Sequence, residues 1–172
     1  YDTPMHPWRR ENIEAERILT TDYALKNKRE LWKMTSILTG FKDRAKRLIT
    51  AQGEQADKER KQLMQKLERL GLVGAGARLD AVLGLNVNNI LERRLQSVMF
   101  RRGLARTMSQ ARQFIIHQHV MVGEKSVAAP SYLVLRAEET IIGFSPRSQL
   151  SSIDHAERKP IERKPKKRRE VK

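Results

Sequence analysis

The first half of the chain places its apolar residues with the period of an α-helix. A first helical segment extends from Pro7-Trp8 to Tyr23, and Asn27 is in position to cap the helix that follows. In this second helix the apolar residues recur at steps of three and four, at Leu31, Met34, Leu38, Phe41, Ala45 and Leu48. This spacing predicts a single apolar stripe, with basic residues mostly off it at Lys42, Arg44, Lys46 and Arg47.

A third helix is predicted after Gly53, with Leu63, Leu67 and Leu70 on one face. Two apolar stripes that follow each other closely predict a helical hairpin in which each stripe covers the other. An intermolecular coiled coil is the alternative, but the repeat is too short to require one. We therefore interpret residues 1–89 as a helical N-terminal region.

The pattern changes after residue 89. Asn86 is placed to cap a helix that includes Ile90, Leu91, Leu95, Val98 and Met99 and ends at Gly103. The segment 107–110, Thr-Met-Ser-Gln, has the form of a capping box, in which a hydroxyl and an amide side chain satisfy free backbone donors. The helix that begins there would bury Ala111, Phe114 and Ile115.

Short strands are predicted after His119. Val120 and Val122 alternate with Met121, residues 123–125 form a turn, and Val127 follows. Pro130 restricts the backbone before an apolar stretch at 132–135, and another at 141–144 returns as a strand. We therefore expect an α+β fold: the helical region 1–89, then a small domain at 90–150 with two helices packed on a short antiparallel sheet, then a basic tail at 151–172.

Charge narrows the choice of partner. The chain carries 35 Lys and Arg against 20 Asp and Glu, a net charge of +15 and a pI near 10.6. Such a chain repels itself, which favours a polyanionic partner, with nucleic acid first and an anionic membrane surface second. The positive charge is densest after residue 150, where apolar residues are few. This tail is expected to be disordered alone and ordered only along RNA.

Two absences in the sequence limit the chemistry. There is no cysteine, which excludes disulfides, thiol nucleophiles and cysteine-ligated zinc. No apolar run approaches the roughly 20 residues of a membrane-spanning helix, so a soluble intracellular protein is expected. His117 and His119 lack a third ligand nearby in the sequence, so no metal site and no cofactor are predicted.

The most informative residues are basic and cluster between 93 and 125. They are Arg93, Arg94, Arg101, Arg102, Arg106, Arg112, His117, His119 and Lys125. Guanidinium groups along two short helices can fork onto successive phosphates, and the N-terminus of the second helix would add free amides. The alternative interpretation is an ordinary solvated basic face, which the net charge and the tail make less attractive.

Five blocks in this region resemble the RNA-binding domain of the ribosomal protein S-four family. They are Leu91-Glu-Arg-Arg-Leu-Gln96, Arg102-Gly-Leu-Ala-Arg-Thr107, Ala111-Arg-Gln-Phe-Ile115, His117-Gln-His-Val-Met-Val122 and Pro130-Ser-Tyr132. Upstream, residues 23–32 and 79–85 resemble the archaeal and eukaryotic branch of that family, and the resemblance covers about residues 5–150. It implies binding at a multi-helix junction of small-subunit ribosomal RNA, a role in nucleating assembly, and a contribution to translational accuracy.

The resemblance also implies partners and contact residues. Neighbouring small-subunit ribosomal proteins near the messenger entry are expected, in a cytoplasmic ribosome, with no membrane and no small-molecule substrate. RNA-contacting roles are implied for Arg94, Arg101, Arg106, Thr107, Arg112, His117, His119 and Lys125. Position and charge add Arg93, Arg102, Lys28, Arg44 and Arg47 to the predicted set.

Two departures from the family pattern stand out. Gln118 occupies a position where many members have Gly, so we expect a slightly strained corner between helix and strand. Gln96 replaces an Asp that is common in bacterial members, which again favours the archaeal branch.

An RNA-modifying enzyme, or its accessory module, is the main alternative. Arg78-Leu-Asp80 is similar to a tripeptide around the catalytic Asp of RNA pseudouridine synthases, which often carry the same small domain. Those enzymes need a large mixed β catalytic domain, whereas residues 1–89 are predicted to be helical. The sequence therefore favours a non-enzymatic protein, with an accessory module second and a membrane-surface protein third.

Overall fold

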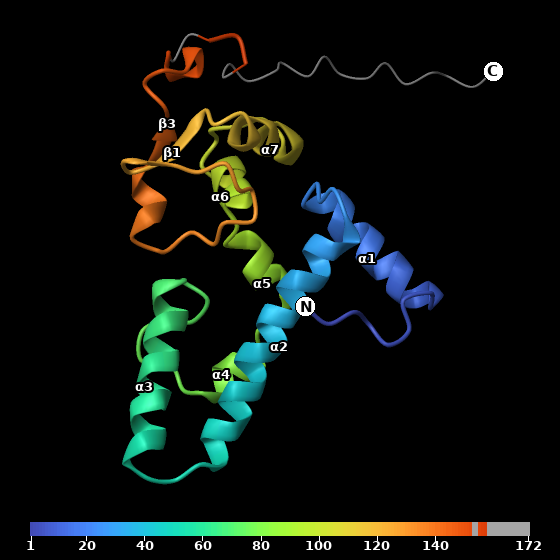
Figure 1. Ribbon diagram of the computed structural model, residues 1–172, viewed down its shortest axis with the longest axis vertical. Helices are drawn as coiled ribbons and strands as arrows, with labels where there is room; N and C mark the ends of the chain where they lie inside the picture. The colour runs from blue at the N-terminus through green and yellow to red at the C-terminus, as the bar shows by residue number, and fades with distance from the viewer. Residues whose placement is uncertain (153–154, 158–172) are drawn as a thin grey trace, which may run out of the picture.

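The computed structural model describes residues 1–152 and 155–157 and has the predicted α+β architecture (Figure 1). The N-terminal helices are α1 (Arg10–Asp22), α2 (Lys28–Thr50), α3 (Glu54–Arg69), α4 (Asp80–Leu83) and α5 (Val87–Glu92). They are followed by α6 (Leu95–Arg101), α7 (Met108–Ile116), β1 (Val120–Val122), β2 (Lys125–Ser126), η1 (Glu138–Ile141), β3 (Ile142–Phe144) and η2 (Gln149–Ser151). Most of the predicted tail, at 153–154 and 158–172, lies outside the described residues.

Helix α2 organises the N-terminal region. It contacts α1, α3, α4 and α5, and Figure 1 shows α3 returning alongside its second half. All six predicted stripe residues of α2 are buried, and they share one core with Leu63, Leu67 and Leu70. Each such side chain stabilises the fold by about 1.5–3 kcal/mol relative to exposure. The predicted helical hairpin is therefore confirmed.

One predicted helix is two helices in the structure. Helix α5 ends at Glu92, and α6 begins at Leu95 after Arg94 adopts an extended backbone with φ −69° and ψ 144°. The segment 132–134 takes the backbone hydrogen bonds there: Leu95 N donates to the carbonyl of Tyr132 at 2.7 Å, and Val134 N donates to that of Arg93 at 2.9 Å. The prediction of one continuous helix from 86 to 103 was therefore wrong.

The small domain packs α6 and α7 against a three-stranded antiparallel sheet in the order β2-β1-β3. Val120, Met121 and Val122 of β1 pair with Phe144, Gly143 and Ile142 of β3, and β2 pairs with the other edge of β1. A second core lies between the layers and includes Leu95, Val98, Phe114, Ile115 and Val120. The predicted strand at 141–144 is confirmed, whereas 132–135 contributes one isolated bridge.

The two cores adjoin each other around a pair of arginines. The first core ends along the chain at Leu91 and the second begins at Leu95, with Arg93 and Arg94 between them. Both arginines are buried, at 9% and 1% exposed. Buried cations need partners, so the polar contacts that join the two parts of the molecule begin here.

Across the parts of the chain that the structure describes, no helix is both long enough and apolar enough to cross a bilayer.

Candidate nucleic-acid interface

Two of the predicted arginines converge on Glu30, in the first turn of α2. Its carboxylate accepts a hydrogen bond from Nη2 of Arg94 at 2.6 Å, and two from Arg112 of α7 at 2.6 and 3.2 Å. Arg94 is almost fully buried, and the Arg112 and Glu30 side chains are under one-fifth exposed. Glu30 therefore joins the N-terminal region to the start of α6 and to the middle of α7.

The surroundings of Glu30 favour its charged form. Partial burial acts to raise the pKa of this carboxyl, but the hydrogen bonds and positive charges of Arg112 and Arg94 outweigh burial and lower the pKa below its ordinary value. The ionised carboxylate is therefore part of the folded structure. Breaking a buried pair of this kind leaves an uncompensated charge and is strongly destabilising.

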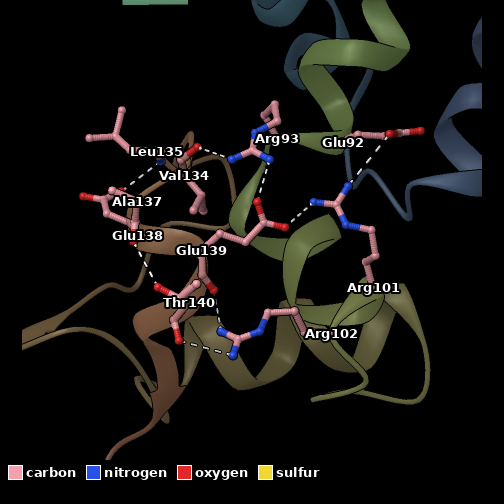
Figure 2. A network of polar contacts seen from close by, with 10 residues as sticks. All are labelled: Glu92, Arg93, Arg101, Arg102, Val134, Leu135, Ala137, Glu138, Glu139 and Thr140. Carbon is pink, nitrogen blue, oxygen red and sulfur yellow. Dashed lines mark hydrogen bonds and ion pairs between the residues drawn. The ribbon is translucent and has the colours of Figure 1, made fainter. Parts of the chain in front are cut away.

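Glu139, in η1, is the second carboxylate that collects arginines (Figure 2). It accepts from Arg93 at 2.8 Å and from Arg101 at 2.7 Å, and Arg93 also donates to the carbonyl of Val134 at 3.0 Å. The hydrogen bond from Arg93 lowers the pKa of Glu139, burial opposes this shift, and Arg101 adds to it. Arg93 also packs against Gly71, where an added Cβ would lie 3.3 Å from the guanidinium carbon.

Arg102 binds backbone carbonyls of the same segment. Its Nη1 donates to the carbonyl of Glu139 at 2.5 Å and its Nη2 to that of Thr140 at 3.3 Å (Figure 2). Nη1 also donates to the carbonyl of Ile142 at 2.9 Å. These carbonyls belong to the end of η1 and the start of β3. Although the residue is exposed, its guanidinium therefore satisfies the free acceptors at the end of a short helix.

Helix α7 begins with the predicted capping arrangement, in a slightly different form. The Thr107 hydroxyl accepts from the backbone N–H of Gln110 at 3.1 Å, as expected. The Gln110 side chain accepts from the N–H of Arg106 at 2.7 Å rather than from that of Thr107. The Arg106 guanidinium donates to the carbonyl of Ala156, and Gln110 donates to that of Glu157 at 3.4 Å. The start of the tail therefore lies against this turn.

The corner between α7 and β1 has a different character. His117 is exposed, His119 is half-buried, and Gln118 between them has a positive φ of 59°. Non-glycine residues rarely adopt that backbone conformation, so the predicted strain at Gln118 is confirmed. Beside this corner lies a hollow of about 600 Å³, whose polar lining is His117, Gln118, His119, Ser126, Ser145, Arg147 and Ser148. We call it the corner hollow.

The remaining predicted contact residues are exposed. Lys125 lies in β2, and Arg44 and Arg47 line a groove between α2 and α3 together with Lys66. Lys28 forms an ion pair with Glu16 of α1 at 3.0 Å and is 43% exposed. These four side chains are distributed over both parts of the molecule, so the structure does not bring them to one place.

The arginines predicted to form one open edge thus each have a hydrogen-bond partner inside the protein. Arg93, Arg94, Arg101, Arg102 and Arg112, with Glu30 and Glu139, form what we call the arginine network. The expectation of an open edge is wrong for Arg93 and Arg94, because both are buried. Sequence reasoning missed the carboxylates that hold the network, and it missed Arg147 and Ser148 beside the histidines. The signal for these two was the turn-forming Ser-Pro-Arg-Ser at 145–148.

Metal binding has no support in the structure. Among the described residues, 1–152 and 155–157, no three His, Cys, Asp or Glu side chains gather in a way that could hold an ion. The ring centroids of His117 and His119 are 6.2 Å apart, and His119 also lies edge-on to Phe114.

Comparison with known proteins defines the class first. Residues 93–141, which contain most of the arginine network and the histidine corner, match the S4 domain. The match begins at Arg93, between the two cores, and extends to the end of η1. The small domain is therefore an S4 domain.

The whole chain has close relatives. The small ribosomal subunit protein uS4 of Methanococcus aeolicus is 50% identical over 159 residues, which is 92% of this chain and 90% of that protein. The protein of the same name from Methanococcus maripaludis is 47% identical over 92% of this chain and 89% of its own length. That of Sulfurisphaera tokodaii is 45% identical over 86% and 84%. The chain belongs to the uS4 family of small ribosomal subunit proteins, and the predicted resemblance to its archaeal branch is confirmed.

Proposed function

We propose that the chain is a structural constituent of the small ribosomal subunit that binds ribosomal RNA at a multi-helix junction, helps to nucleate assembly and contributes to translational accuracy. Membership of the uS4 family is the observation that carries this proposal. The net charge of +15 supports it, because a chain with such self-repulsion is stabilised beside a polyanion. The chain works in the cytoplasmic ribosome, with small-subunit proteins near the messenger entry as neighbours and without membrane, small-molecule substrate or cofactor.

The proposed RNA contacts are basic side chains that are exposed or half-buried, and one exposed hydroxyl. In the small domain they are Arg101, His117, His119 and Lys125, with Arg106 and Thr107 at the start of α7. In the helical region they are Lys28, Arg44 and Arg47. Arg93, Arg94, Arg102 and Arg112 hold the fold together, so we leave them out of the direct contacts. The division into the regions 1–89, 90–150 and 151–172 belongs to the same proposal.

Salt dependence of RNA affinity tests the proposal. Each phosphate neutralised by Lys or Arg releases condensed counterions, so six or more contacts should give a slope of log affinity against log salt steeper than about −4. The measurement uses the full chain and transcribed small-subunit RNA. A flat slope would contradict binding through phosphates. Co-sedimentation with intact small subunits through a high-salt wash is expected as well.

An accessory module of an RNA-modifying enzyme remains the alternative function. Asp80 begins the four-residue helix α4 within the helical region, and α1 to α5 account for the ordered elements there without a sheet. No catalytic role is therefore proposed for it. Incubating the purified chain with small-subunit RNA should leave every base unchanged by mass spectrometry. A modified base would favour the enzyme.

A further inference from the structure

The corner hollow contains a serine–histidine pair that controls the histidine hydrogens. Oγ of Ser148 lies 2.9 Å from Nδ1 of His119, and it also accepts a hydrogen bond from the backbone N–H of Leu150 at 3.2 Å. The hydroxyl keeps its own hydrogen, which it can donate to Nδ1. With that donation, Nδ1 of the neutral imidazole is the acceptor and Nε2 carries the hydrogen, and this is the tautomer that our proposal assigns.

The pair is held rigidly from both sides. Ser148 is 8% exposed, and the turn at 145–148 closes with Ser148 N donating to the carbonyl of Ser145 at 2.9 Å. That turn is tied to the histidine itself, because Ser145 N donates to the carbonyl of His119 at 2.8 Å. Nε2 of His119 has no hydrogen-bond partner among the described residues. In the tautomer that our proposal assigns it is a donor, on a side chain that lines the hollow.

The other polar side chains of the hollow are either positively charged or neutral. Arg147 is exposed, and its guanidinium makes no ion pair or hydrogen bond with any residue that the structure describes. Ser126 and Ser145 contribute hydroxyls, and His117 contributes a second imidazole. None of the described lining residues is acidic. A site with charged and neutral donors but no carboxylate favours an anion over a cation.

The size of the hollow suits more than a bare ion. About 600 Å³ lies within the range of small-ligand sites and accommodates a nucleotide. The residues that line the hollow come from the end of α7, from β1 and β2, and from the turn that follows β3. In an RNA-binding chain, the anion with this shape is a backbone phosphodiester with its ribose.

We propose that the corner hollow binds one phosphodiester group of RNA, with Arg147 and Nε2–H of His119 as its donors and Ser148 as the positioning residue that fixes the tautomer of His119. This inference rests on the proposed function and adds Arg147 and Ser148 to it. Arg147 supplies charge and a forked donor, whereas Ser148 does not touch the phosphate. The two residues should therefore give different signatures when they are replaced.

The test compares variants of the full chain for affinity to transcribed small-subunit RNA over a range of salt. Arg147→Ala should weaken binding about tenfold, because one charge-assisted contact is lost. Its salt slope should become shallower by about 0.7–0.9, the value of one phosphate contact. Arg17→Ala, which removes an exposed arginine from α1, is the matched control and should change neither quantity to this extent.

Ser148→Ala should weaken binding several-fold at an unchanged salt slope, since no charge is removed, and Ser148→Thr should restore it. Nitrogen-15 NMR of the imidazole should show the Nε2–H tautomer of His119 in the parent chain and a mixture in Ser148→Ala. Melting curves identify variants that lose binding because they unfold. If Ser148→Ala is such a variant, binding by Ser148→Thr and the NMR signal of His119 in the parent chain test the role of Ser148.

The outcomes separate the two proposals. If the parent chain binds RNA with a steep salt slope and Arg147→Ala behaves like Arg17→Ala, the hollow is not a phosphate site, although the proposed function stands. If the parent chain shows no salt-dependent RNA binding, the proposed function fails together with this inference. An Nδ1–H tautomer in the parent chain would overturn the role of Ser148.

Discussion

The arginines of the arginine network and the arginine of the corner hollow all belong to the small domain, but they differ in their partners. In the network, guanidinium groups meet two carboxylates and a row of backbone carbonyls, and Arg94 is 1% exposed. In the corner hollow, Arg147 and Nε2 of His119 have no partner among the described residues, and none of the described lining side chains is acidic. Some positive side chains therefore hold the fold together, and others are left open for a ligand. The residues in contact with each side chain show to which group it belongs.

The network also explains how two small cores become one molecule. Glu30 lies 64 residues from Arg94 and 82 residues from Arg112 along the chain. Further contacts cross between the same parts: Nε2 of Gln96 donates to the carbonyl of Tyr23 at 3.1 Å, and Arg136 N donates to that of Arg69 at 2.7 Å. Because the hydrogen bonds at this junction are directional, they fix the orientation of the small domain relative to the N-terminal region as well as holding the two in contact.

The largest expected effect comes from removing the carboxylate of the network. Glu30→Ala leaves the Arg94 guanidinium buried without its counter-charge and should lower the free energy of unfolding by about 3–5 kcal/mol. Glu92→Ala is the matched control: this carboxylate is 58% exposed and lies 3.9 Å from Arg101, so its loss should change stability by less than about 1 kcal/mol. Urea unfolding measures both. Equal losses would remove the distinction between the network and ordinary surface pairs.

Acid should weaken the arginine network by protonating its two carboxylates. Because the folded-state pKa of Glu30 and that of Glu139 lie below their unfolded values, their stabilisation is fully present above the unfolded pKa. It is lost as pH falls through the lower, folded pKa. The stability difference between the parent chain and Glu30→Gln should therefore narrow as pH decreases below 4.5. A constant difference down to the acid limit would contradict a role for the charge.

The smallest expected effect lies at the corner itself. Gln118 has φ 59°, a conformation that costs a residue with a Cβ about 1–2 kcal/mol, whereas Gly adopts it freely but loses more chain entropy on folding. Gln118→Gly should therefore raise the free energy of unfolding by about 0.5–1 kcal/mol, and Gln118→Ala, which keeps the Cβ, should not. The expected result is a melting temperature about 2 °C higher for Gln118→Gly than for the parent chain, with no increase for Gln118→Ala.

Sequence reasoning recovered the features that depend on near neighbours. The stripe of α2 follows from residues three and four apart, and the cap of α7 from residues three apart, so local spacing was enough to place Leu38 or Thr107 correctly. The break between α5 and α6 was missed because Leu91 and Leu95 keep helical spacing across it. Only the distant segment at 132–134, which takes the backbone hydrogen bonds, causes the break.

In the candidate site too, features that depend on neighbouring residues were predicted and features that depend on distant residues were missed. The basic character of residues 93–125 and the histidine pair were visible in the sequence, and so was the strain at Gln118. Burial of Arg93 and Arg94 was not, since it depends on Glu139 and Glu30 from remote parts of the chain. Arg147 was missed for the same reason: the turn after β3 places it beside His119, 28 positions earlier in the chain.

The most direct measurement is a density map of the small ribosomal subunit that contains this chain. Our account predicts a phosphate oxygen within hydrogen-bonding distance of Arg147 and of Nε2 of His119, while Arg93 and Arg94 keep Glu139 and Glu30 as partners. A map in which RNA phosphates contact Arg94 directly, with Arg147 facing solvent or another protein, would contradict the division between the network and the hollow.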